Sequence, residues 1–338
     1  MIRAAAFVAL ATALPALASD HPASRFRAMS EPDCPSPMAI IAEAATAPTN
    51  QTYLRVQHIG DPGTPEWSDE VATVVTWDVG ARSGYTPPPI ENAQRGYRDV
   101  TGDSAFQLGC RGAGFYIDTS RFSHAVALVG EGPSASVARD FAPPKYLYSD
   151  GASLMLEATV ALPSAATQAP PVDAGTAQLS FFYYVRDEIS GSVFVHLVSL
   201  FDNRPWGSGG SGYESVGSDG VTAFVSSPLA LTTAAGNATQ YASVGPGSAT
   251  MRTASGWSAA VTFRAVVTQE QFEALLARLR AGPMPQLSPR PANYRVLSFG
   301  VLGEVFPYAG DANNVILGGS VVDMALREVP LRKLSVRH

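Results

Sequence analysis

The 338-residue chain carries little charge, and lysine is nearly absent from it. Charged residues make up 15% of the sequence, the formal net charge is -6, and Lys145 and Lys333 stand among scattered arginines. Because no basic stripe is present, we expect no binding to nucleic acid or to an anionic membrane surface. Beyond the first 18 residues no apolar run is long enough to cross a bilayer, so we expect no membrane span.

Motifs that would identify common enzyme classes are also missing. The sequence contains no H-E-x-x-H, no G-x-S-x-G and no phosphate-binding P-loop. Residues 207–212 match G-x-G-x-x-G, but Tyr213 and Glu214 follow without any helical period. A dinucleotide site needs a helix to begin at the third glycine, so we expect no cofactor.

Cysteine is limited to Cys34 and Cys110. In an exported protein such a pair commonly forms a disulfide, which we expect here, with two buried free thiols as the alternative. Neither cysteine has the spacing of a metal site. The segment "GDANN" at 310–314 has oxygen ligands suited to calcium but not the full loop spacing, which favours a turn, and we expect no metal.

The first 18 residues have the three parts of a secretory signal. Arg3 lies near the start, an apolar stretch runs to Leu17, and Ala16-Leu17-Ala18 is a small-residue cleavage pattern. We therefore expect cleavage after Ala18 and a secreted or periplasmic protein. Asn50 and Asn237 match the short glycosylation sequon, which is a weak signal.

Short β patterns dominate from about residue 100. Alternation of apolar and polar residues predicts strands with one buried face in "SLMLEATVAL", "WSAAVTFRAVV" and "SVVDMALREV", where Val322, Met324 and Leu326 share the buried side. Runs that are apolar on both faces, at 179–185 and 193–201, predict central strands joined as a hairpin, and 294–306 predicts a further strongly apolar strand. Gly300 and Gly303 indicate a bulge or a close backbone approach.

One segment has a helical period instead. In "TQEQFEALLARLRAGP", Thr268 is the expected N-cap, Gln271 completes a capping box, and Gly282-Pro283 ends the helix. We expect an amphipathic helix near 269–281 that covers the sheets. Residues 19–90 are expected to form an N-terminal extension packed on a β-sandwich domain at 91–330, and 331–338 a C-terminal tail.

Many short antiparallel strands with a lone helix predict an all-β, two-sheet sandwich of jelly-roll type. From "SAFQLG" at 104–109 to "VDMALREV" at 322–329, the order of features resembles the concanavalin A-like and laminin-G-like sandwiches of secreted lectins and polysaccharide-active enzymes. The resemblance consists of strand rhythm and carries no diagnostic motif, so it concerns the fold. The E-x-D-x-x-E pattern of related hydrolases is absent, and of the alginate-lyase-like motifs "FVHL" keeps only the histidine.

The stretch at 193–220 concentrates the candidate site residues. After the apolar strand come polar and aromatic side chains suited to sugar hydroxyls and sugar rings. We expect the ligand-binding residues to be Asp202, Arg204, Trp206, Tyr213 and Glu214. The alternative is a long hairpin loop in which Asp202 starts a turn and Arg204 pairs with Glu214 or Asp219.

His196, Tyr213 and Glu304 are the candidates for catalysis. Strict alternation places His196 on the same strand face as Asp202. Because the other residues of that face are mostly apolar, His196 is predicted first of all to be a core histidine. Glu304 lies within an apolar strand, where it either pairs with an arginine or serves as an acid. We expect a secreted lectin-like protein that binds carbohydrate or an extracellular polymer. The alternatives are a polysaccharide lyase or glycoside hydrolase using the same groove, and a structural or adhesion protein.

Overall fold

The computed structural model describes residues 38–46, 51–58, 73–78, 96–98, 104–108, 113–118, 134–146, 152–167, 175–202, 215–218, 223–229, 238–249, 257–307 and 315–330. The predicted signal peptide, both cysteines, the 310–314 segment and Asn50 and Asn237 lie outside these ranges. No helix of the described residues is long and apolar enough to cross a membrane.

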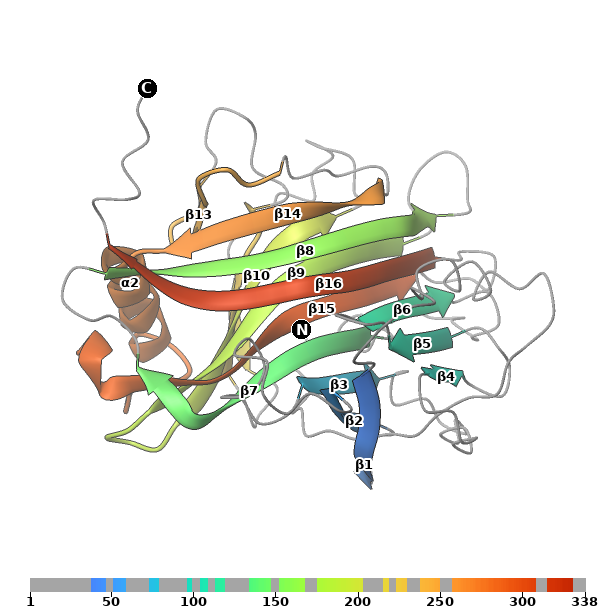
Figure 1. Cartoon of the computed structure of the whole chain (residues 1–338). Helices are drawn as coiled ribbons and strands as arrows, with labels where there is room; N and C mark the ends of the chain where they lie inside the picture. Colours follow the sequence, from blue (N-terminus) through green and yellow to red (C-terminus); the bar gives the residue numbers. More distant parts are fainter. Residues whose placement is uncertain are drawn as a thin grey trace, which may run out of the picture.

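The described chain forms two β-sheets, shown in Figure 1. The larger sheet contains, in spatial order, β1 (Met38–Thr46), β2 (Gln51–His58), β3 (Thr73–Asp78), β7 (Ser134–Tyr146), β15 (Tyr294–Pro307), β9 (Gly175–Asp187), β10 (Val193–Asp202), β12 (Ala223–Ser227) and β11 (Ser215–Ser218). The smaller sheet contains β13 (Ser243–Val244), β14 (Trp257–Val267), β8 (Ala152–Thr167), β16 (Val315–Pro330), β6 (Ala113–Asp118), β5 (Ser104–Leu108) and β4 (Gly96–Arg98). All strand pairs are antiparallel except β10 with β12.

The main hydrophobic core lies between the two sheets. Leu156 and Val160 of β8 meet Leu179 and Phe181 of β9 in one buried cluster. Alternation along these strands sends every second side chain into this cluster, as the period of two in the sequence requires. The expected all-β, two-sheet sandwich is confirmed.

A β-bulge in β16 shifts the predicted alternation by one residue. The register with β8 is interrupted between Val321 and Asp323, so Val321, Met324 and Leu326 enter the core cluster. Met324 and Leu326 thus lie on the buried side that the sequence pattern predicted, and the side chain of Val322 is outside what the structure describes. A bulge inserts one extra residue on one strand and thereby reverses the alternation beyond it, which the pattern alone does not predict.

Helix α2 (Gln269–Arg280) covers one end of the sandwich, at the left of Figure 1. Its N-terminus has the predicted capping box, in which the Thr268 side chain accepts from the Gln271 backbone and the Gln271 side chain accepts from the Thr268 backbone. Phe272 packs against Phe194 and Tyr294, with ring centroids 6.3 and 5.5 Å away. These rings fix the helix to both β10 and β15.

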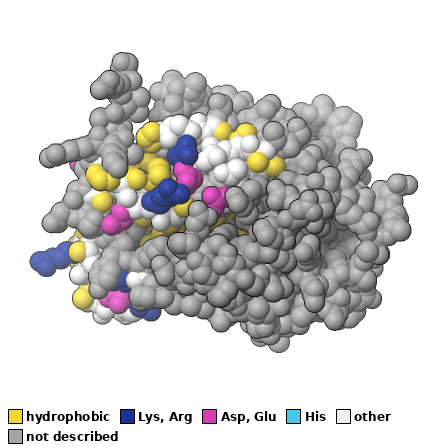
Figure 2. Space-filling view, in the orientation of Figure 1, with side chains coloured by type: hydrophobic (Ala, Val, Ile, Leu, Met, Phe, Trp, Pro, Cys, Tyr) yellow, Lys and Arg dark blue, Asp and Glu magenta, His cyan; other side chains and the backbone are white. Residues whose placement is uncertain are grey.

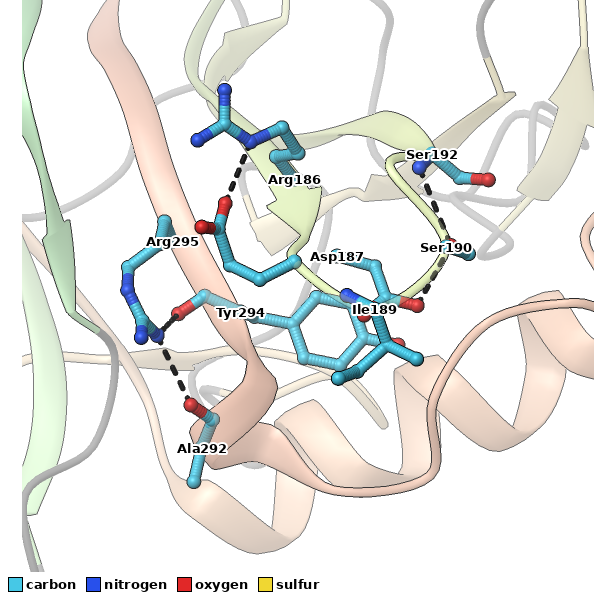
Figure 3. Close-up of polar contacts among 9 residues, drawn as sticks. Arg186, Asp187, Ile189, Ser190, Ser192, Ala292, Tyr294 and Arg295 are labelled. Carbon is cyan, nitrogen blue, oxygen red and sulfur yellow. Dashed lines mark hydrogen bonds and ion pairs between the residues drawn. The ribbon is translucent and has the colours of Figure 1, made fainter.

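A buried carboxylate organises the turn between β9 and β10, shown in Figure 3. Asp187 accepts hydrogen bonds from the Ile189 amide at 3.0 Å and the Ser190 hydroxyl at 2.8 Å. It also accepts from the buried Ser288 amide at 2.8 Å, which ties the hairpin to the chain that follows α2. The Tyr294 hydroxyl donates to the Ser288 carbonyl at 2.5 Å, and burial, followed by the charge of Asp187, raises the pKa of Tyr294.

Gly300 of β15 is required by a close approach. A Cβ atom there would lie 2.3 Å from the Val137 carbonyl oxygen and 2.7 Å from the Phe182 ring. This is the close backbone approach that the sequence indicated as one of two options at the β15 glycines. The register irregularity of β15 falls elsewhere, between Val296 and Ser298.

The outer face of the smaller sheet carries a compact ion-pair cluster. Glu157 of β8 contacts Arg264 of β14 and, at 3.2 Å, Arg327 of β16. Figure 2 shows acidic and basic side chains side by side on this face. Among the described residues of this face, Glu157 is therefore shared between two arginines.

Candidate functional site

Three polar side chains from adjacent strands form a row on the larger sheet. Asp202 of β10 is the register partner of Gln178 of β9, which is in turn the partner of Glu304 of β15. The Gln178 side-chain amide donates to a Glu304 carboxylate oxygen at 3.0 Å. We call Asp202, Gln178 and Glu304 the strand-end row, because Asp202 is the last residue of β10.

The strand-end row faces away from the smaller sheet. Along β9, Ala177 and Leu179 belong to the core between the sheets, so Gln178 projects to the other side. Gln178 and Glu304 are partly exposed, whereas Asp202 is 1% exposed. Further along this outer face, a second apolar cluster is formed by Ala138, Phe182, Val195, Leu197, Phe224 and Leu302. The outer face is therefore polar at the strand end and apolar at its middle.

A bulge separates His196 from Asp202, which corrects the expectation that they share a face. The pairing of β10 with β9 is interrupted between Ser199 and Phe201, leaving Leu200 as the extra residue. His196 lies opposite Tyr183 in the core, whereas Asp202 lies opposite Gln178 on the outer face. Strict alternation cannot predict this reversal, because a bulge is a property of the strand pair.

His196 belongs to a buried hydrogen-bonded chain across three strands. Its Nδ1 atom lies 2.7 Å from the Tyr183 hydroxyl and its Nε2 atom 2.7 Å from the Ser227 hydroxyl. All three side chains are fully buried, and burial lowers the pKa of His196 to about 3 and raises that of Tyr183. A neutral imidazole has one donor and one acceptor nitrogen, so the two hydroxyls take opposite roles.

The burial of these three hydrogen-bonded side chains keeps them away from any substrate. Ser227, His196 and Tyr183 are hydrogen-bonded in the order of a nucleophile, its base and an orienting group. A general base must reach a proton of the substrate, and here no member of the chain has exposed surface. His196 is therefore placed as a core histidine that links β9, β10 and β12.

Four of the predicted ligand-binding residues lie outside the described residues. Arg204, Trp206, Tyr213 and Glu214 fall within 203–214, as does the glycine- and serine-rich segment. In the sequence this segment joins Asp202 of β10 to Ser215 of β11, and both of these strands belong to the larger sheet. Asp202, Glu304 and His196 are thus the candidates within the described residues, and the sheet brings Asp202 and Glu304 into one row, apart from His196.

Sequence reasoning missed Gln178, Tyr183 and Ser227. Each stands in a run that signals a strand, and none belongs to a recognisable motif. Their significance comes from contacts between residues far apart in the chain, such as the 126-residue separation of Gln178 and Glu304. Among the described residues, no group of three or more His, Cys, Asp or Glu side chains is placed to hold a metal ion.

The fold defines the protein as a two-sheet β-sandwich with a polar row at one end of its larger sheet. No family model and no curated protein matches the sequence. Similar solved structures include the family 11 xylanase from Neocallimastix patriciarum, with 9% identity, a TM-score of 0.28, and coverage of 86% of this chain and 99% of that chain. A family 12 xyloglucanase from Bacillus licheniformis in complex with ligand has 12% identity and a TM-score of 0.29, with coverage of 87% and 99%.

A third similar structure is the xyloglucanase domain of NopAA, a type three effector from Sinorhizobium fredii, in complex with cellobiose. It has 8% identity, a TM-score of 0.28, and coverage of 75% of this chain and 94% of that chain. TM-scores this low are insufficient to assign this chain a family or an activity. The sandwich class rests on the two sheets and their shared core.

Proposed function

We propose that this protein binds a carbohydrate or another extracellular polymer at the polar end of the larger sheet. The observation that carries the proposal is the strand-end row, in which the partly exposed Gln178 and Glu304 side chains are hydrogen-bonded to each other on the outer face, beside the buried Asp202. Planar carboxylates and amides bind pairs of hydroxyl groups in fixed directions, which is the chemistry a sugar presents. Export of the protein, predicted from its first 18 residues, is part of the same proposal.

Chain connectivity supports a contribution from the following segment. Strand β10 ends at Asp202, and Arg204 and Trp206 follow it in the sequence by two and four residues. A tryptophan supplies a flat apolar face for a sugar ring, and an arginine supplies paired donors for hydroxyl groups. These two residues together with the strand-end row form the proposed binding site.

Replacing the proposed stacking residue should abolish binding. We expect Trp206→Ala to lose retention on an insoluble polysaccharide that holds the wild-type protein, with an unchanged melting curve, because Trp206 belongs to the site and not to the described core. Ile189→Ala is the matched control, since Ile189 is an apolar side chain that is 72% exposed at the other end of β9 and β10. Equal retention of Trp206→Ala and wild type would remove Trp206 from the site.

Glycoside hydrolysis is the second candidate, and the spacing of the two carboxylates favours it. Asp202 and Glu304 lie in one row with one strand between them, so two inter-strand steps of about 4.8 Å separate their Cα atoms by about 9.6 Å. Glycosidases place two carboxyl groups about 5 to 9.5 Å apart, and Asp202, which is 1% exposed, would have to become uncovered on substrate binding to act as the second carboxyl group. In this reaction Glu304, which accepts from Gln178, would donate or take the proton.

Enzyme activity would appear as released reducing ends across a polysaccharide panel. We expect Glu304→Gln to lower that release at least about 100-fold, because a general acid–base group contributes about 10²- to 10⁴-fold. Gln178→Glu would place a third carboxylate in the row and is expected to weaken activity less severely. If the wild-type protein binds polysaccharide but releases no sugar, hydrolysis is rejected and only the binding function is kept.

A further inference from the structure

The hydrogen bond between His196 and Ser227 joins β10 to two short strands at one side of the larger sheet. β12 pairs in parallel with β10 over five register positions and antiparallel with β11 over four, and β11 ends this sheet in the described part of the chain. By contrast, β9 pairs with β15 over thirteen positions. Parallel pairing is also slightly less stable per residue than antiparallel pairing. Among the strands beside His196, β12 with β11 therefore separates from the sheet at the smallest loss of backbone hydrogen bonds.

The buried chain of Tyr183, His196 and Ser227 has no place for a further proton. With a neutral ring, two hydroxyl hydrogens and one N–H hydrogen share only two hydrogen bonds, so one hydroxyl hydrogen already lies outside both. A second proton on the ring makes both ring nitrogens donors, and both hydroxyls must then accept. Their two hydrogens point away from the ring, and among the described residues neither hydroxyl has another hydrogen-bond partner. Protonation thus adds a charge and a second unplaced donor where no member of the chain has exposed surface.

The described core supplies no charge that compensates a protonated His196 ring. The ring stands opposite Tyr183 on β9 and Val225 on β12, and the residues of β8, β14, β16 and α2 in the shared core are apolar. Asp202 lies on the other face of the sheet, and Asp187 is held by three donors in the hairpin turn. Burial alone, with no part played by a neighbouring charge, lowers the pKa of His196 to about 3. The other ionisable side chains of this core are tyrosines, which ordinarily lose their proton only near pH 10: Tyr183, Tyr241 and Tyr294.

We infer that protonation of His196 opens the larger sheet locally, by releasing β12 and β11 from β10 while the rest of the sandwich stays folded. Release of β12 removes Ser227 and Val225 from one side of the ring and lets water reach it. The charged ring is then hydrated, and the hydroxyl hydrogens find water as their acceptor. The same step uncovers one edge of β10, whose residues from Phe194 to Asp202 are otherwise buried. This acid-triggered opening goes beyond the proposed binding function and does not depend on it.

Hydrogen exchange resolved by strand tests the opening. Amide exchange of β12 is compared with that of β9 and β15 at pH 7 and pH 4, after correction for the intrinsic pH dependence of exchange. With the ordinary pKa of 6.5 for His196 in the open form, the opening equilibrium rises about 200-fold between these pH values. We expect that rise in β12. At pH 4 we also expect β12 to exchange at least tenfold faster than β9 and β15, with little dependence on low urea, because a local opening exposes little surface.

Two variants and a matched control assign the opening to the histidine. In His196→Gln, which has no titratable ring, the rise in β12 exchange between pH 7 and pH 4 should be absent. Ser227→Ala removes the bond between the ring and β12 and should speed β12 exchange at pH 7 at least tenfold. Ser226→Ala is the control and should behave as wild type, because Ser226 is the adjacent serine, is partly exposed and lies beside Leu197 on the outer face.

Three results overturn the inference. If β12 exchanges at pH 4 at the same rate as β9 and β15 and with the same urea dependence, the sandwich opens as a whole and no local release occurs. A rise in β12 exchange of less than about tenfold on acidification shows that the edge does not respond to protons. A full rise that persists in His196→Gln shows that another group governs it. The comparison between strands uses the wild type alone, so it decides the question even where a variant does not fold.

Discussion

Acidification should destabilise this protein strongly through one histidine. His196 is fully buried, and its pKa is lowered from 6.5 to about 3. At 1.36 kcal/mol per pKa unit, this difference corresponds to about 5 kcal/mol of unfolding free energy. We expect the contribution to be fully present above pH 6.5 and to be lost as the pH falls towards 3.

The sign follows from proton linkage. Between pH 6.5 and about 3 the unfolded chain binds a proton at His196 and the folded protein does not, so protons favour unfolding in this window. The physical cause is removal of the charged ring from water. Loss of hydrogen bonds is not the cause, since both neighbouring hydroxyls, on Tyr183 and Ser227, are able to accept from a protonated imidazole.

Urea denaturation at pH 7 and pH 4 measures the effect. The wild type should lose about 3 kcal/mol between these two values through His196, in addition to what its carboxylates contribute. In His196→Gln, which keeps a polar group without a titratable ring, this part of the loss should disappear. His58→Gln is the control for loss of a histidine elsewhere. Identical pH dependence in wild type and His196→Gln would show that the buried ring does not govern acid stability.

The sequence predicted the larger features of this fold because they depend on local patterns. The capping residues Thr268 and Gln271 and the apolar face of α2 lie within one short segment. The hairpin of β9 and β10 likewise joins neighbouring runs. In each element the information is carried by residues within a few turns or strand positions of one another.

The site could not be predicted in the same way, because it depends on register between distant strands. Gln178 and Glu304 meet only because β15 pairs with β9, and nothing in either segment specifies that pairing. Single extra residues, at Leu200 in β10 and Val322 in β16, reverse the side-chain alternation. A period of two applied through a bulge assigns the wrong face to every residue beyond it.

The proposed binding row and the stability of the sheet are separable in this molecule. The strand-end row lies where β10 ends, whereas the Asp187 carboxylate holds the hairpin at which β9 and β10 meet. Asp187 is fully buried and joins the hairpin to Ser288 beyond α2. Its removal should therefore affect folding without changing the chemistry of the row.

Replacing Asp187 by alanine should lower the free energy of unfolding by about 3 kcal/mol. The substitution removes the acceptor for three donors, and the buried Ser288 amide would be left without its partner at a cost of about 1 to 3 kcal/mol. Asp187→Asn keeps the size of the side chain and one acceptor oxygen, so its free energy of unfolding should lie between those of wild type and Asp187→Ala. Chemical denaturation at pH 7 measures all three proteins.

Glu188→Ala is the matched control for this prediction, because it removes a carboxylate one residue away in the same turn. Glu188 pairs with Arg186 at 2.6 Å, but both side chains are more than one-third exposed. Solvent screens such a pair, and its loss should cost no more than about 0.5 kcal/mol. An equal loss of stability in Glu188→Ala and Asp187→Ala would mean that charge in the turn matters and the buried hydrogen bonds do not. A larger loss in Asp187→Ala, with Asp187→Asn intermediate, would identify the bond to Ser288 as the link between the hairpin and the chain that follows α2.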